Sequence, residues 1–343
     1  MSQAVRHALG LVIGRFQPFH RGHEVICRHA LEHSERLLII LGSGQQARSV
    51  RNPWTDAERE QLIRNSLPDV APERLLFESV PDVFYNEQVW LDYVDRAVHR
   101  HADDRGVCLF GHTKDSSSYY LALFPQWGYE ELPNFQDLSA TPLREALLGA
   151  GPADLDATLA SWAWAMPACG DAPLRALLQA PAFVDMCAEF EVIAAHRKAW
   201  AQSPYPPVFV TVDALVECKG HVLLIQRGHR PGKGLWALPG GFVDQQERLQ
   251  RGAERELQEE TGLDLGMLAT QRLGNRAYDA PERSDRGRVI THVFHYRLDE
   301  ASLPAVRGGD DAAHARWWPV AEIEREQMFD DHYCVLQHAL DLY

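Results

Sequence analysis

Residues 241–263 read GFVDQQERLQRGAERELQEETGL, and this stretch decides the fold of the second half of the chain. Helical spacing puts Glu256, Glu259 and Glu260 at positions i, i+3 and i+4, so the three carboxylates share one helix face. Like charges at this spacing repel one another unless a cation neutralises them. A solvated acidic face is the alternative interpretation, because most runs of charge lie in water.

The other fixed positions of the stretch argue against that alternative. Glu247 follows Gly241 after five residues, Arg255 follows after seven more, and Gly262-Leu263 ends the run. The whole pattern, GX5EX7REUXEEXGU with U aliphatic, resembles the signature of the Nudix hydrolases at every fixed position.

This resemblance implies a hydrolase that depends on a divalent cation. Clustered carboxylate oxygens suit Mg2+, with Mn2+ as the alternative, since Mg2+ keeps several waters and takes its other ligands from substrate phosphates. The implied catalytic and metal ligands are Glu256, Glu259 and Glu260, and the implied substrate contacts include Gly240 and Gly241.

The composition indicates a globular protein of two domains. The length of 343 residues is about twice that of a common domain. The net charge of −14 argues against a broad basic face for nucleic acid. Small phosphorylated ligands remain compatible with it, because a few arginines and helix N-termini are enough to hold them.

The cysteines and the apolar runs indicate a soluble protein of the reducing cytoplasm. The chain lacks a CxxC pair, which argues against a disulfide framework or a zinc cluster. No apolar run approaches the roughly 18–20 residues of a membrane span, and MSQAVRHALG lacks a signal-peptide core. The six cysteines are scattered: Cys27, Cys108, Cys169, Cys187, Cys218 and Cys334.

The first half of the chain begins with a strand, loop, helix, strand unit. Residues 10–13 and 37–41 are short apolar runs that predict buried parallel strands, and residues 24–35 have helical spacing. The loop between the first strand and the helix is 14–23, GRFQPFHRGH. In such a unit, ligands bind at the carboxyl ends of the strands, with phosphate at the helix N-terminus.

The loop ends in His20-x-Gly22-His23. Core histidines or zinc ligands are alternatives, but the glycine-containing loop leaves both rings facing a cavity without a third or fourth ligand nearby. The stretch is similar to the HxGH nucleotidyltransferases, and as a whole to the archaeal type of nicotinamide mononucleotide (NMN) adenylyltransferases. The resemblance implies that His20 and His23 bind the triphosphate and stabilise charge. It also implies nucleotide contacts from Gly14, Arg15, Phe16 and Gln17.

A second motif of that family, SxTxxR at a helix start, is matched by residues 139–144, SATPLR. Thr141 is the expected N-cap and Pro142 the first helical residue. An ordinary helix start is the alternative, but it leaves Arg144 in the first turn, where a cation opposes the helix dipole. The resemblance implies that Arg144 binds phosphate and that Ser139 and Thr141 contact substrate.

Three further residues of the first half are candidate contacts. Arg48 follows the second strand and is either a phosphate ligand or a surface arginine; Thr55 and Glu58 nearby form a capping box. Trp90, in a run that resembles the nicotinamide-side loop of the family, either stacks on the pyridine ring or packs a helix. The strand of residues 107–110 ends in GHTKD, where Gly111 permits close approach of a ligand.

The boundary between the domains is expected at residues 203–207, SPYPP, which cannot continue a helix. Residues 151–201 before it are alanine-rich and predict helices, and residues 208–216 and 222–226 after it predict strands around a turn. The expected division is an NMN adenylyltransferase domain over 1–185, a helical and proline-rich linker over 186–207, and a Nudix domain over 208–343.

Downstream, residues 280–290 resemble a segment of the ADP-ribose type of Nudix hydrolases. The family more often has Asp-Pro where this chain has Ser284-Asp285. Arg286 and Arg288 are candidates for the diphosphate or the terminal ribose. Asp310 and Asp311 are either general-base candidates or a solvated turn, and we favour the turn.

Both halves together resemble the bifunctional NMN adenylyltransferase/Nudix hydrolases. The implied α/β folds are a Rossmann-like HxGH domain with a parallel sheet and a Nudix α/β/α sandwich with a mixed sheet. The implied reactions make NAD and pyrophosphate from ATP and NMN, and cleave ADP-ribose to AMP and ribose 5-phosphate. We expect these nucleotides as partners, without nucleic acid or membrane, and self-association stays open.

Two other functions compete with this interpretation. One is the same pair of folds acting on another mononucleotide or another nucleoside diphosphate. The other is a regulator that senses NAD metabolites, in which a degraded Nudix box precedes a winged helix. Here the box is intact and only a short helical tail follows Trp318, so we prefer the enzyme.

Overall fold

The computed structural model describes residues 7–103, 106–112 and 122–343. The chain forms two compact units, Met1–Ala188 (unit 1) and Glu189–Tyr343 (unit 2), and each is described by itself. Residues 113–115 of the expected ligand-approach loop lie outside the described residues. The domain bounds expected from the sequence stay a prediction.

Unit 1 is built on a five-stranded sheet of order β3-β2-β1-β4-β5, in which every neighbouring pair is parallel. The parallel sheet expected from the sequence is therefore confirmed. All five residues of β4 are buried, as a strand covered on both faces requires. The strands are β1 (His7–Gly14), β2 (Ser34–Leu41), β3 (Leu75–Ser79), β4 (Val107–Gly111) and β5 (Gly128–Glu131).

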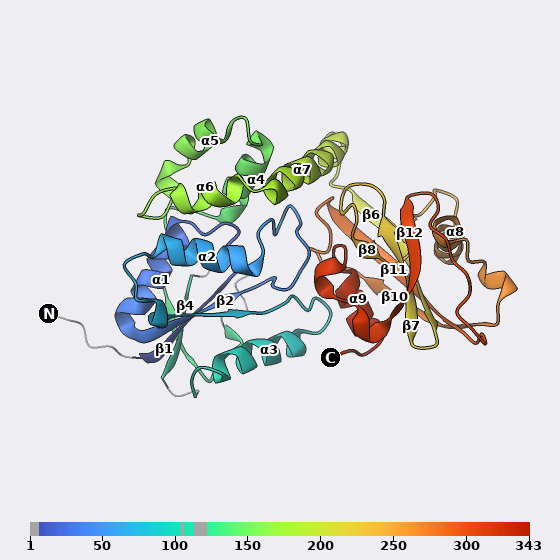
Figure 1. Ribbon diagram of the computed structural model, residues 1–343, viewed down its shortest axis with the longest axis horizontal. Coiled ribbons are helices and arrows are strands. Elements are labelled where there is room, and N and C mark those ends of the chain that lie inside the picture. The colour runs from blue at the N-terminus through green and yellow to red at the C-terminus, as the bar shows by residue number, and fades with distance from the viewer. Residues whose placement is uncertain (1–6, 104–105, 113–121) are drawn as a thin grey trace. The chain divides into compact units, whose positions relative to one another are not determined.

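Helices cover both faces of this sheet. Figure 1 shows α1 (Arg21–His33) and α2 (Asp56–Ser66) on one side of the strands and α3 (Glu87–His99) on the other. Thr55 caps α2 in a reciprocal capping box with Glu58, which confirms that prediction. Because the strands are parallel, the loops after β1, β2 and β4 open on the same edge of the sheet.

The segment after the sheet is helical, as its alanine-rich composition predicted. Short helices precede a 20-residue helix, α7, and the division between the two units falls inside α7. The helices are α4 (Ala140–Ala150), α5 (Leu155–Ser161), α6 (Ala172–Leu178) and α7 (Pro181–Trp200).

Unit 2 is built on a mixed sheet of order β10-β11-β6-β7-β12, with β8 paired to β7 and β9 paired to β6. The β6–β11 pair is parallel and its neighbours are antiparallel. Figure 1 shows α8 and α9 on opposite sides of these strands, so the expected sandwich is confirmed. The elements are β6 (Val208–Cys218), β7 (His221–Arg227), β8 (Trp236–Ala237), β9 (Gly240–Phe242), α8 (Leu249–Thr261), β10 (Thr270–Tyr278), β11 (Arg288–Leu298), β12 (Ala312–Pro319) and α9 (His332–Ala339).

Each unit has its own apolar core. In unit 1 the core lies between the sheet and α3, and includes Leu9, Leu38 and Val98. In unit 2 it lies under α8, with Ala253 and Leu257 packed on Val212 of β6. Among the described residues, none of the helices has the length and apolar character needed to cross a bilayer.

Candidate active sites

The loop between β1 and α1 is fixed by its two histidines. His20 is the N-cap of α1, and its Nδ1 accepts from the backbone N–H of His23 at 3.4 Å. In return, His23 Nδ1 accepts from the backbone N–H of His20 at 3.3 Å. Since each Nδ1 is an acceptor, each neutral ring carries its proton on Nε2. The loop therefore presents two Nε2–H donors at the start of a helix, where anions bind.

Aromatic packing holds these rings in place. The His20 and His23 rings stack with centroids 3.7 Å apart and planes 16° apart. The Phe16 ring lies edge-on to His23 at 4.8 Å and is 1% exposed. Phe16 reaches this place from a left-handed backbone, φ 53°, and a Cβ on Gly14 would lie 3.0 Å from its ring. The Phe16 ring thus positions His23, and the expected nucleotide contact of this residue stays a prediction.

The side chain of Gln17 has partners within the protein, and its expected nucleotide contact stays a prediction. Its buried side-chain amide donates to the carbonyl of Trp54 and accepts from the N–H of Trp54. Arg59, which sequence reasoning missed, donates to the carbonyls of Arg15 and Gly42, both at 2.7 Å. These hydrogen bonds join the loop after β1 to residues that follow β2. They also engage the side chains of Gln17 and Arg59 with protein groups.

Arg144 is part of the same framework. Its guanidinium is buried and donates to the carbonyls of Val50 at 3.0 Å and Gln17 at 2.8 Å. The expected N-cap was wrong: α4 begins at Ala140 with Ser139 as N-cap, and the Thr141 hydroxyl instead accepts from Arg144. Because Arg144 is the fifth residue of α4, it also lies beyond the first turn, where the helix dipole would oppose it most.

The other candidate residues of unit 1 also contact other groups of the protein. Arg48 forms a two-pronged pair with Glu58, with Nη2 2.9 Å from Oε1, which favours a structural role over phosphate binding. Trp90 packs beside Phe124 against the core, which favours the helix-packing alternative. Gly111 is buried at the end of β4, as expected for a close approach, and its carbonyl accepts from Leu132.

The candidate site of unit 2 begins with two glycines of β9. A Cβ on Gly240 would lie 2.3 Å from the carbonyl of Val212, and one on Gly241 would lie 2.6 Å from Glu256 Oε1. Only glycine lets β9 pass this close to the carboxylates of α8. The N–H of Gly240 then donates to Glu260 Oε2 at 2.9 Å.

Arg255 arranges the carboxylates on α8. Its guanidinium donates to Glu247 at 3.0 and 3.1 Å, to Glu256 at 3.0 Å and to Glu259 at 2.8 Å. The helix confirms that Glu256, Glu259 and Glu260 lie on one element. Glu247 and Arg255 stand in the sequence signature, but their positioning role was missed because spacing alone does not show which side chains an arginine joins.

The carboxylates fit a divalent cation. Burial raises the pKa of Glu260 to about 8, and burial also raises the pKa of Glu256 above its ordinary range. These shifts mean that the ionised carboxylates lack enough compensating positive charge in the protein alone. Carboxylate oxygens on one face, two of them lining a pocket, are the ligands that a hard divalent ion prefers.

A pocket of about 320 Å³ opens beside these carboxylates. Arg286 lines it, with its guanidinium 5.3 Å from the centre of the Phe242 ring. Arg288 lies outside its lining and donates to the carbonyl of Asp279, so the structure separates the two expected arginines. Asp310 and Asp311 border the pocket, but both are exposed and lie in a turn, as the favoured interpretation of a solvated turn predicts.

The pocket also contains residues that the sequence analysis did not assign. Arg283 lines it and forms a buried bidentate ion pair, at 3.0 and 2.9 Å, with Asp331, which lies outside the lining. His332 Nδ1 accepts from Leu238, and burial near Arg283 holds the pKa of His332 well below its usual value. Asp213 also lines the pocket, and its signal in the sequence was that it is the one acid in residues 208–216; nothing in the sequence distinguished His332.

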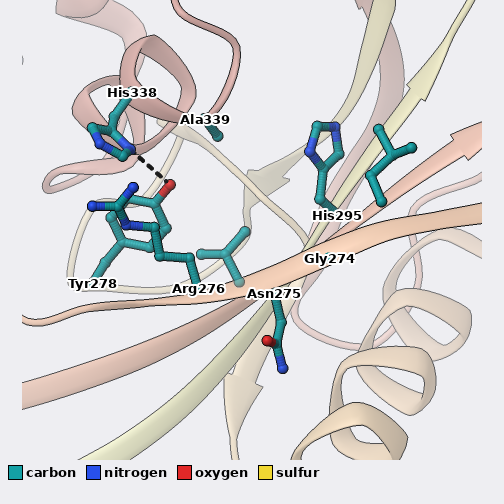
Figure 2. A pocket seen from close by; sticks show the side chains of 9 residues that line it. Gly274, Asn275, Arg276, Tyr278, His295, His338 and Ala339 are labelled. Carbon is teal, nitrogen blue, oxygen red and sulfur yellow. Dashed lines mark hydrogen bonds between the residues drawn. The ribbon is translucent and has the colours of Figure 1, made fainter.

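A second pocket of unit 2, about 210 Å³, lies between β10, β11 and α9 (Figure 2). The Tyr278 hydroxyl and His338 Nδ1 are 3.3 Å apart across it, and Arg276 and His295 line it. Its described lining contains none of the three carboxylates of α8, so the metal-binding chemistry belongs to the first pocket.

Family models match both units. A NUDIX domain model matches residues 206–339, and a cytidylyltransferase-like model matches residues 11–80. The matched segments contain the α8 carboxylates and the two stacked histidines, respectively.

Three relatives illustrate the similarity. Two crystal structures of a bifunctional NMN adenylyltransferase/ADP ribose pyrophosphatase from Francisella tularensis, one complexed with AMP and a Mn ion, each cover 98% of this chain and 99% of their own. Their TM-scores are 0.88 and 0.86, with 33% and 32% identity. The nicotinamide/nicotinic acid mononucleotide adenylyltransferase of Acinetobacter baylyi is 43% identical over 136 residues, 39% of this chain and 72% of that protein. The ADP-ribose pyrophosphatase of Methanocaldococcus jannaschii is 37% identical over 128 residues, 36% of this chain and 72% of that protein.

Proposed function

Since this chain belongs to the family of bifunctional NMN adenylyltransferase/ADP ribose pyrophosphatases, we propose that unit 1 makes NAD and unit 2 hydrolyses ADP-ribose. The observation that carries the proposal is the presence of two chemically different sites in one chain. One site presents imidazole N–H donors at a helix N-terminus, and the other presents clustered carboxylates that suit a divalent cation.

In unit 1, an oxygen of the NMN phosphate attacks the α phosphorus of ATP, and the bond to the β phosphate oxygen breaks to release pyrophosphate. The attacking phosphate is already ionised at neutral pH, so catalysis consists of positioning and charge stabilisation. His20 and His23 donate Nε2–H bonds to the triphosphate oxygens. Arg144 holds the carbonyls of Val50 and Gln17 and thereby positions the loop that carries both histidines.

In unit 2, Glu256, Glu259 and Glu260 hold a divalent cation, which we propose is Mg2+, with Mn2+ able to replace it. The bound ion supplies a water of lowered pKa and neutralises the diphosphate. Arg286 binds the diphosphate, and Asp310 or Asp311 takes the proton of the attacking water. Cleavage of the diphosphate of ADP-ribose gives AMP and ribose 5-phosphate.

The direct test is to supply each substrate to the full chain. ATP, NMN and Mg2+ should yield NAD and pyrophosphate in equal amounts, and ADP-ribose with Mg2+ should yield AMP. A panel with nicotinic acid mononucleotide and other nucleoside diphosphates would rank the substrates. Absence of NAD formation would refute the assignment of unit 1, and faster cleavage of another diphosphate would replace ADP-ribose as the substrate of unit 2.

We further propose that the protein works in the cytoplasm, because all six cysteines are free thiols, as a reducing compartment maintains them.

A further inference from the structure

A cluster of nitrogen, sulfur and oxygen donors lies at the opposite end of β1 from the loop of residues 14–23. His7, Cys108 and Glu130 each offer one ligand atom, and these three atoms all lie within 4.8 Å of one another. His7 is the first residue of β1, whereas the stacked histidines follow the last. The Cα of His7 therefore lies roughly 20 Å from the end of β1 at which the nucleotide loop begins, and Cys108 lies beside Gly10, in the middle of the strand.

The fold brings the cluster together from residues far apart in the sequence. Strands β1, β4 and β5 are consecutive neighbours in the sheet, and Cys108 pairs with Gly128 while Phe110 pairs with Glu130. The side chains of Cys108 and Glu130 therefore project on the same face of the sheet. Gly128 leaves room over the thiol, since a Cβ there would lie 3.4 Å from Cys108 Sγ.

Helix α1 brings a fourth donor to this face. His29 Nε2 lies 2.5 Å from Glu130 Oε1. His33, one turn later, donates from Nδ1 to the carbonyl of His29 at 2.8 Å, which fixes the end of the helix. His29, Glu32 and His33 form a second group whose donor atoms also lie within 4.8 Å of one another.

An apolar wall backs the donors. The Phe110 ring is 1% exposed and lies edge-on to the His7 and His29 rings, with centroids 6.1 and 5.9 Å away. Cys108 is 3% exposed. Water is therefore excluded from one side of the cluster, which strengthens ligand bonds to a cation and disfavours a hydrated hard ion.

We propose that His7, Cys108, Glu130 and His29 bind one Zn2+ ion. Two imidazoles, a thiolate and a carboxylate are the ligand types of tetrahedral zinc sites, whereas Mg2+ prefers oxygen alone. An ion pair between His29 and Glu130 requires neither His7 nor Cys108, so the approach of these two further donors to the same carboxylate is the observation that points to a metal. The sequence argued against a zinc cluster because it lacks CxxC; this site uses a single cysteine with partners from other elements.

The ion ties the edge of the sheet to a helix. Strand β5 has four residues and lies at the edge, and Glu130 is its only contribution to the cluster. Zinc would join β5 to β1, β4 and α1 through one centre. We therefore expect Zn2+ bound at this site to stabilise unit 1.

Cobalt(II) spectroscopy of the full, metal-stripped chain tests the site. Thiolate bound to Co2+ gives a sulfur-to-metal charge-transfer band in the near ultraviolet, which the all-oxygen site on α8 does not produce. We expect this band to saturate at one equivalent and to disappear when Zn2+ displaces Co2+. Cys108→Ser should abolish it, and Cys169→Ser, at an exposed cysteine outside the cluster, should leave it unchanged.

Two further variants decide the result if Cys108→Ser does not fold. His29→Gln and Glu130→Gln each remove one ligand and should weaken Co2+ binding, measured by the same band, at least about tenfold. Zn2+ should also raise the melting temperature of the wild type more than that of either variant. A folded wild type without the thiolate band, or a band that survives loss of Cys108 or is unchanged by both glutamine variants, would overturn the proposal.

Discussion

Arg144 shows how one residue can serve both the fold and the site. Its guanidinium satisfies the carbonyls of Val50 and Gln17 inside the protein. Arg144→Ala should therefore lower the free energy of unfolding by about 2 kcal/mol or more, because it leaves buried carbonyls without donors. The helix dipole alone would suggest the opposite, since a cation near a helix start is unfavourable and its removal would not cost stability.

Thermal unfolding in the absence of nucleotide measures this effect. Arg96→Ala, on an exposed part of α3, is the matched control and should change the melting temperature little. We also expect kcat for NAD formation to fall at least about tenfold in Arg144→Ala, because the loop that holds His20 and His23 loses its support. An unchanged melting temperature together with a raised KM alone would show that Arg144 acts only in binding substrate.

Asp213 gives a second prediction at the scale of one residue. Burial raises the pKa of Asp213 to about 6, although the Thr291 hydroxyl donates to its carboxylate. The folded protein therefore holds a proton that the unfolded chain has already released, so stability falls as pH rises from about 4 to about 6. Asp213→Asn has no charge to bury. It should gain stability over the wild type across that interval, by on the order of 2 kcal/mol.

The measurement is unfolding at pH 4.5 and at pH 7 with metal removed by a chelator. Glu322→Gln, at an exposed acid of unit 2, should show a nearly constant difference from the wild type. If the gain for Asp213→Asn is the same at both pH values, proton binding at Asp213 does not cause it.

The sequence motifs predicted which residues form the sites better than they predicted the contacts of those residues. The motifs identified the stacked histidines and the carboxylates, because those residues are defined by type and spacing. They did not show that the Gln17 side chain bonds to Trp54 or that Arg48 pairs with Glu58, because these contacts depend on how the loops fold. Arg286 and Arg288 are two residues apart in the sequence, yet only Arg286 lines the pocket.

At the scale of elements, periodicity was informative where one face is buried. The helix α1 and the strands β1, β2, β4, β6 and β7 were predicted because their apolar residues recur with helical spacing or form short runs, whereas α8 was predicted from the spacing of its carboxylates and the signature. Strand β10 was not, because its residues from Gln271 to Ala277 are exposed and show no alternation. The start of α4 was misplaced because Ser139 and Thr141 are both good caps by type, and the bond from Arg144 engages Thr141.

The helix α8 carries the prediction for the metal site. Glu259→Gln keeps size and helix propensity but removes a ligand charge, so hydrolysis of ADP-ribose should fall roughly 10²–10³-fold. Glu259 is 46% exposed and also pairs with Arg255, so the loss of that pair offsets the relief of repulsion. The free energy of unfolding without metal should then change by less than about 1 kcal/mol.

Melting curves of the full chain without nucleotide complete this test. Mg2+ should raise the melting temperature of the wild type more than that of Glu259→Gln, because a ligand stabilises the folded state in proportion to its affinity. Glu254→Gln is the matched control, because this acid of α8 pairs with Arg251 and not with Arg255, which joins the signature carboxylates. Near-normal hydrolysis by Glu259→Gln would remove this carboxylate from the metal site.

At the scale of the whole molecule, the two activities should be separable. The histidines lie in unit 1 and the carboxylates in unit 2, and each unit has its own core. His23→Ala should abolish NAD formation while ADP-ribose hydrolysis stays within about threefold, since sites without shared contacts behave independently.

His23→Gln is the sharper variant: His23 is the third residue of α1, and Gln at that position can still accept from the N-cap N–H. It should keep the capping box and the melting temperature while losing the imidazole, so a loss of synthesis there is chemical rather than structural. Glu259→Gln should do the reverse, losing hydrolysis and keeping synthesis. If a folded His23→Gln protein lost both activities, the two sites would have to be coupled, and independent chemistry in the two units would be wrong.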